Sequence, residues 1–113
     1  MPSVKYDIVI EQGATFGLTL TYENPDETPI DLTGMTARMQ VRDASDDSLI
    51  IELTTENGRI TLGEATGKIT LAITAADTAA LDRGGVYDLE LVNGTEVNRI
   101  IQGKATLSEE VTK

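Results

Sequence analysis

The strongest constraint on the fold is an alternation of apolar and polar residues that runs along nearly the whole chain. The alternation is clear in eight segments, which carry most of the apolar residues: 6–10, 16–22, 35–41, 49–53, 60–62, 69–73, 87–91 and 97–107. A period of two places successive side chains on opposite faces of a strand, so each segment predicts a half-buried β-strand. Strands with one polar face predict two packed antiparallel sheets or a small barrel.

The segment 74–91 predicts a short helix that leads directly into a strand. Thr74 is placed to cap the backbone N–H of Asp77, and the carboxylate of Asp77 favours the positive end of a helix. We therefore expect one helical turn over residues 74–81. A short helix followed by a strand in this way is how many β-sandwiches cross from one sheet to the other.

The start of the following strand favours an immunoglobulin-like sandwich over a barrel. Gly84 and Gly85 allow the backbone to reverse, and Tyr87 begins the next alternating series. In immunoglobulin-like domains a tyrosine at this corner bonds through its hydroxyl to upstream backbone. We therefore predict an all-β fold, a single immunoglobulin-like antiparallel β-sandwich of about eight strands formed by residues 1–113.

Glycine and asparagine mark the expected turns. Asn57-Gly58 and Asn93-Gly94 predict β-hairpins, because a type I′ turn needs positive φ at both central residues. The motif Asp31-Leu32-Thr33-Gly34 predicts a local turn in which the polar side chains bond to backbone and the leucine plugs the end of the sandwich. Gly103 interrupts the last strand, which predicts a bulge or a close backbone approach.

The chain contains neither histidine nor cysteine. This composition excludes Ser-His-Asp and Cys-His sites, His-ligated zinc and thiolate metal sites. Two carboxylates could serve a glycosidase, but few stacking platforms are left for a sugar ring, because all aromatic residues fall in alternating, core-like positions: Tyr6, Phe16, Tyr22 and Tyr87. A chain of 113 residues also has little room for a deep pocket. We expect neither enzyme activity nor a cofactor.

The charge balance restricts the partners. Nine Lys and Arg residues stand against 19 Asp and Glu residues, which gives a formal net charge of −10. Such a surface repels phosphate backbones and anionic lipids, so we expect neither a nucleic acid nor a membrane as partner. No apolar run approaches the roughly 20 residues of a transmembrane helix. Residues 1–7 lack a secretory signal pattern, so synthesis and folding in a cytoplasm are expected.

The segment 43–47 carries three aspartates, Asp43, Asp46 and Asp47, whose oxygens are suitable ligands for calcium. The spacing lacks the turn glycine and the closing glutamate of an EF-hand, so we expect an exposed, solvated loop. A melting temperature that rises in millimolar calcium and falls again in EDTA would indicate an ion site instead.

The order of these features resembles small immunoglobulin-like proteins and domains of tailed-bacteriophage tails and baseplates, such as the N-terminal domain of siphophage upper baseplate proteins. The segments that carry the resemblance are 12–16 (QGATF), 29–37 (PIDLTGMTA), 41–43 (VRD), 67–71 (GKITL), Leu81 and 85–89 (GVYDL). The resemblance implies a structural role and supplies no catalytic residues. Upper baseplate proteins are much longer, so the roles of their helical and receptor-docking parts do not transfer to this chain.

The resemblance implies a non-enzymatic virion structural protein of the tail, baseplate or fibre-attachment region, made in the host cytoplasm and assembled with other virion proteins in a symmetric, multi-copy arrangement. The alternatives are a carbohydrate- or host-surface-binding module, a capsid-surface decoration protein and a bacterial immunoglobulin-like stalk or adhesin domain. Exposed loop and terminal residues are expected to contact the neighbours: Tyr6, Asp7, Asp43, Asp46, Asp47, Ser108 and Glu109.

Overall fold

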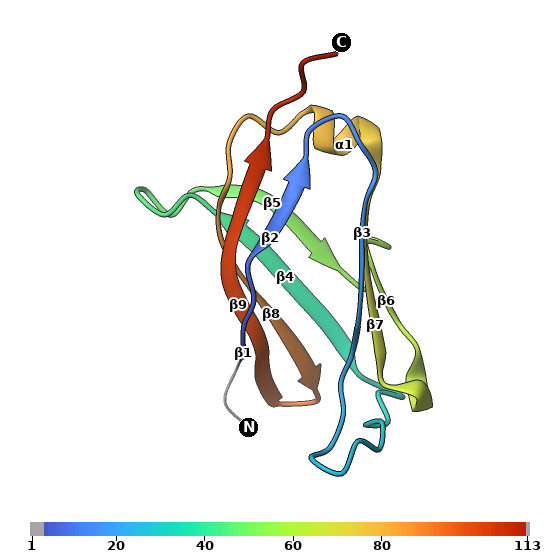
Figure 1. Cartoon of the computed structure of the whole chain (residues 1–113). Coiled ribbons are helices and arrows are strands. Elements are labelled where there is room, and N and C mark those ends of the chain that lie inside the picture. Colours follow the sequence, from blue (N-terminus) through green and yellow to red (C-terminus); the bar gives the residue numbers. More distant parts are fainter. Residues whose placement is uncertain (1–3, 113) are drawn as a thin grey trace.

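The computed structural model describes residues 4–112 and contains two facing β-sheets (Figure 1). The large sheet comprises β1 (Val4–Lys5), β2 (Ile8–Glu11), β9 (Glu96–Ser108), β8 (Gly85–Asn93), β4 (Thr36–Arg42) and β5 (Leu49–Thr54). The small sheet comprises β3 (Phe16–Thr21), β7 (Lys68–Ile73) and β6 (Ile60–Leu62).

The strand order is that of an immunoglobulin-like sandwich. Strands β9-β8-β4-β5 follow the G-F-C-C′ order of such domains, and β3-β7-β6 follow the B-E-D order. The N-terminal strands β1 and β2 pair with β9 in parallel, whereas the other strand pairs are antiparallel. The predicted fold class is confirmed, and the parallel N-terminal pairing is a feature that alternation alone does not reveal.

The core lies between the two sheets and is almost wholly aliphatic. Leu53, Leu71 and Leu89 have no solvent exposure, since each lies on the inward face of its strand. Leu32 is 1% exposed and belongs to this core, which confirms that the leucine of the turn motif points inward. In that motif Asp31 Oδ1 accepts hydrogen bonds from the Thr33 N–H at 2.9 Å and from its hydroxyl at 2.6 Å.

The crossing between the sheets forms at α1 (Ala75–Ala79), between β7 and β8 (Figure 1). The Thr74 hydroxyl accepts the Asp77 N–H at 3.2 Å, which confirms the predicted cap. Thr78 is fully buried; its hydroxyl donates to the Ala14 carbonyl at 2.8 Å and accepts the Gly13 N–H at 3.1 Å. These bonds fix the helix to the turn between β2 and β3.

One further helical segment is the 3₁₀ turn η1 (Glu64–Thr66), between β6 and β7. In the part of the chain that the structure describes, no helix has the length and apolar character needed to cross a membrane.

Gly84 and Gly85 allow close strand contacts at the start of β8. Neither has a positive φ, so neither adopts the left-handed conformation that favours glycine. A Cβ on Gly84 would clash with the carbonyl oxygen of Ala105 in β9, and one on Gly85 would clash with the carbonyl of Arg42 in β4. The absence of a side chain lets β8 lie between its two neighbours at this point.

The two Asn-Gly pairs form different structures. Asn93-Gly94 lies in the predicted β8–β9 hairpin, but the central residues are Gly94 and Thr95, and only Gly94 has positive φ, at 62°. This sign pattern is that of a type II′ turn. The hairpin predicted at Asn57-Gly58 is wrong, because this segment carries the chain from β5 in the large sheet to β6 in the small sheet. The Asn57 side chain accepts the backbone N–H groups of Thr54 and Arg59, both at 3.0 Å, which provides a local turn in place of strand pairing.

We expect Leu89→Ala to lower the free energy of unfolding by about 2–5 kcal/mol, because truncation leaves a cavity between the sheets. Leu49→Ala is the matched control, since Leu49 is 48% exposed and its removal is expected to cost less than about 1 kcal/mol. Urea unfolding of both variants measures the difference. Equal losses would contradict the assigned register of β8.

Candidate functional site

Tyr6 and Asp7 join β1 to β2 and fasten both strands to the large sheet. The Tyr6 carbonyl accepts a hydrogen bond from the Tyr87 hydroxyl, and Asp7 Oδ1 accepts the Lys104 backbone N–H at 2.9 Å. A Cβ on Gly103 would lie 2.5 Å from the Tyr6 carbonyl oxygen, which confirms the close approach predicted at this glycine. We call this set of contacts the N-terminal clamp.

The clamp bears on two predictions. The Tyr87 hydroxyl bonds to upstream backbone, as predicted, and its acceptor is the Tyr6 carbonyl at the joint between β1 and β2. Tyr6 is 44% exposed, so its predicted core-like position is wrong, and the exposure predicted for it as an interaction residue is confirmed. Tyr6 and Asp7 are thus both surface residues and structural residues.

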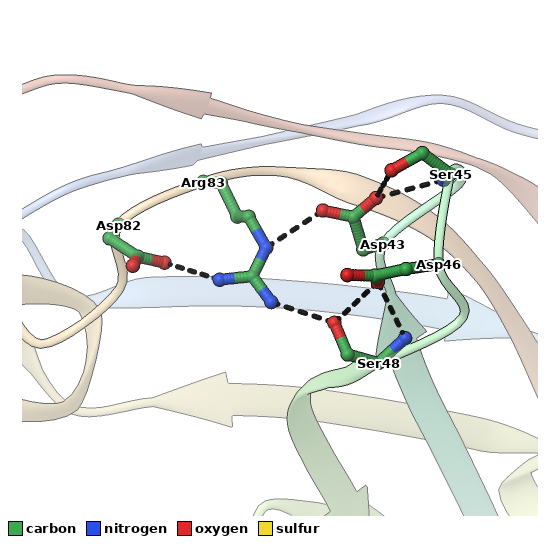
Figure 2. Close-up of polar contacts among 6 residues, drawn as sticks. All are labelled: Asp43, Ser45, Asp46, Ser48, Asp82 and Arg83. Atoms are coloured by element: carbon green, nitrogen blue, oxygen red, sulfur yellow. Dashed lines mark hydrogen bonds and ion pairs between the residues drawn. The ribbon is translucent and has the colours of Figure 1, made fainter.

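The acidic loop between β4 and β5 is ordered by two aspartate turns (Figure 2). Asp43 Oδ1 accepts the Ser45 N–H at 2.8 Å and the Ser45 hydroxyl at 2.6 Å. Asp46 Oδ1 does the same for Ser48, at 3.0 Å and 2.7 Å. The bond from the Ser45 hydroxyl is the main cause that lowers the pKa of Asp43 to about 2, and the Ser48 hydroxyl likewise lowers the pKa of Asp46.

The side chain of Arg83 bonds to this loop from the segment that precedes β8 (Figure 2). Its Nε donates to Asp43 Oδ2 at 2.8 Å, and its Nη2 donates to the Ser48 hydroxyl at 2.8 Å. Its Nη1 pairs with Asp82 at 3.0 Å. Within residues 4–112 no group of three or more acidic side chains is arranged to hold a metal ion. The cation that contacts Asp43 in this structure is the guanidinium of Arg83.

The C-terminal candidates lie at the end of the sandwich next to α1. Ser108 pairs with Glu11 at the end of β2, and its carbonyl accepts the Gln12 N–H at 2.9 Å. The side-chain oxygen of Gln12 accepts the Glu110 N–H at 2.9 Å, and its side-chain nitrogen donates to the Leu81 carbonyl at 2.8 Å. Glu109 is exposed beside these contacts.

The predicted interaction residues therefore do not form one site. They lie at the N-terminal clamp, in the β4–β5 loop and at the end of β9. Asp47, from the loop, lines a hollow on the outer face of the large sheet, and Lys5, the neighbour of Tyr6, lines the same hollow.

This hollow is the surface that the sequence did not reveal. Its volume is about 500 Å³, and its lining contains three cations, Lys5, Arg42 and Lys104, and two aspartates, Asp47 and Asp88. No carboxylate of residues 4–112 lies within 4.0 Å of their charged nitrogens. Val86, which is 43% exposed, supplies an apolar wall. We call this surface the basic hollow.

Strand order explains why the basic hollow is hidden in the sequence. Lys5, Arg42 and Lys104 belong to β1, β4 and β9, which are far apart along the chain. Other cations of the same sheet are paired: Arg38 contacts Glu90 at 2.8 Å and Arg99 contacts Asp88 at 3.3 Å. The exposed alternate positions of each strand could be read from the sequence, but their proximity depends on which strands are neighbours.

Comparison with known proteins gives a structural likeness alone. No protein-family model matches the chain, and no curated protein sequence matches it. A solved chain from a photo-crosslinking study of multimeric cell-adhesive interactions of VGSC beta subunits is similar in structure, with 14% sequence identity and a TM-score of 0.47. The match covers 94% of this chain and 93% of that chain. The fold assignment rests on the strand order described above.

We expect the N-terminal clamp to weaken at alkaline pH. Burial is the main cause that raises the pKa of Tyr87 from 10.0 to about 12, and the negative charge of Asp7 adds to the rise. Because the folded-state pKa lies above the unfolded value, the protonated hydroxyl contributes its full stability below pH 10 and loses it as the pH rises through 12. Urea unfolding over this range is expected to show a steeper loss for the wild type than for Tyr87→Phe. Parallel curves would contradict the assignment.

The β4–β5 loop is expected to titrate at acid pH. The pKa of Asp43 lies below its ordinary value of 3.8, so the contacts of the carboxylate stabilise the fold above that pH and are lost as the pH falls through about 2. In a carboxyl-carbon NMR titration, Ser45→Ala is expected to raise the midpoint of Asp43 more than Arg83→Ala does, because the serine hydroxyl is the larger cause. The reverse order would show that the ion pair dominates.

Proposed function

We propose that this chain is a non-enzymatic structural protein of a tailed-phage virion and that it acts by assembly with other virion proteins. The sequence resemblance supplies the phage context. The immunoglobulin-like sandwich supplies a rigid frame whose exposed surface is available for contacts. The tail, baseplate, fibre-attachment region and capsid surface are all compatible positions for such a domain.

The observation that carries the proposal is the basic hollow. On a chain of net charge −10, cations outnumber carboxylates three to two in this lining, and the three cations have no carboxylate partner in residues 4–112. The same lining includes one exposed apolar side chain, Val86. Local positive charge on an acidic protein attracts acidic surfaces and fixes the orientation of a contact. The neighbour proposed here is a virion protein that presents an acidic segment with an apolar residue to fit against Val86.

The proposed location is tested by quantitative mass spectrometry of purified particles from a phage that encodes the chain. We expect the protein in the particles at a copy number that matches a symmetric ring or array, because virion components repeat by closed symmetry. Its absence from particles, with the protein present in the infected cell, would contradict the proposal.

The proposed surface is tested by charge reversal in the same phage. Lys5→Glu with Lys104→Glu places negative charge in the basic hollow, and neither lysine side chain donates a hydrogen bond among the described contacts. Lys68→Glu, on the exposed face of the small sheet, is the matched control. We expect incorporation of the double variant to fall by about tenfold, which corresponds to 1.4 kcal/mol, while the control assembles normally. Equal incorporation would show that the hollow is not the contact.

A further inference from the structure

The outer edge of β3 is a free strand edge in the small sheet. Among residues 4–112, β3 pairs with β7 alone. The Tyr22 N–H donates to the Gly67 carbonyl at 2.8 Å, in continuation of the β3–β7 register. In an antiparallel ladder every second residue bonds to the same neighbour. The backbone groups of Gly17, Thr19 and Thr21 therefore point away from β7, to the free edge.

These three residues are accessible. Each is exposed, and the Thr19 and Thr21 side chains lie on the outer face of the small sheet. An ideal Cβ on Gly17 would meet no atom within 4 Å. The outer face of the small sheet is therefore open beside this edge.

The edge of β3 lacks the features that usually protect a strand edge. Its sequence, FGLTLT, has no charge and no proline. In β5, by contrast, the Glu52 carbonyl is occupied by Asn57 Nδ2 at 3.0 Å and by Arg59 Nη1 at 2.8 Å. β6 is only three residues long. Among these edge strands β3 is the one suited to strand addition.

We propose that two copies of the chain join through β3, as antiparallel neighbours related by a two-fold axis at Thr19. The sequence of β3 is complementary to itself in this register. Leu18 faces Leu20 of the second copy on the core side, and Gly17 faces Thr21 of the second copy on the outer side. Thr19 faces itself. Each small sheet of three strands becomes half of a continuous sheet of six.

Charge favours this edge as the contact between identical copies. Two chains of net charge −10 repel each other, and the repulsion is smallest where the contact contains no ionisable side chain. No residue of β3 is ionisable. This inference does not depend on the basic hollow or on the phage context, so it can fail or succeed independently of the proposed function.

A single cysteine tests the register directly, because the natural chain contains none. In the proposed dimer the two Thr19 Cα atoms form a hydrogen-bonded pair about 5.5 Å apart, within the range of a disulfide. We expect Thr19→Cys to give a cross-linked dimer under mild oxidation, at a yield at least about tenfold above the controls, as judged by non-reducing electrophoresis of the full chain.

Two other single-cysteine variants serve as controls, because each carries the same thiol at a different position. Thr21→Cys would place its thiols about 14 Å apart, four residue steps along the strands. Thr70→Cys, opposite Thr19 on β7, would place them about 14 Å apart, three strand spacings across the sheet. The proposal is overturned if Thr19→Cys cross-links no more than Thr70→Cys does. It is also overturned if Thr21→Cys cross-links more than Thr19→Cys does. A wild-type chain that sediments as a monomer at millimolar concentration would also overturn it.

Discussion

The contact between the N-terminal chain and β9 at Gly103 determines which strand edges of this sandwich are free. Tyr87 bonds to the Tyr6 carbonyl, Asp7 bonds to the Lys104 N–H, and the missing side chain of Gly103 leaves room for both. These bonds hold β1 and β2 on the large sheet. In immunoglobulin-like domains the first strand can instead cover the B strand of the other sheet. Here β1 and β2 do not, and no strand in the described part of the chain lies on the outer side of β3.

The same contact places Lys5 beside Lys104 and so contributes to the basic hollow. The acidic loop is organised differently, because its aspartates bond to nearby serines and to Arg83. Asp43 and Asp46 are thus engaged within the molecule, whereas Asp47 lines the hollow. Among the cations of the hollow, Arg42 donates to the Gln40 side chain and to the Asp47 carbonyl, and no side-chain bond is found for Lys5 or Lys104 among the described contacts.

The sequence predicts the local features of this fold well, because they depend on neighbouring residues. The cap at Thr74, the turn at Asp31 and the inward positions of Leu89 and Tyr87 follow from spacing alone. It does not predict which sheet a strand joins. Asn57-Gly58 has the composition of a hairpin but carries the chain between sheets, since pairing is decided by the packing of whole strands. The Arg83 contacts and the basic hollow were missed for the same reason, because each joins residues from distant segments.

With the N-terminal clamp formed, the outer backbone groups of β3 are free in the described chain, and we propose that a second copy covers them. Amide hydrogen exchange by NMR at several protein concentrations tests both the free edge and its coverage. We expect the N–H groups of Gly17, Thr19 and Thr21 to exchange rapidly in dilute protein and to become protected as the concentration rises, while Leu18 and Leu20 stay protected throughout. Protection of Thr19 in dilute protein would show that the chain covers its own edge. Rapid exchange of Thr19 at every concentration would show that no second copy binds there.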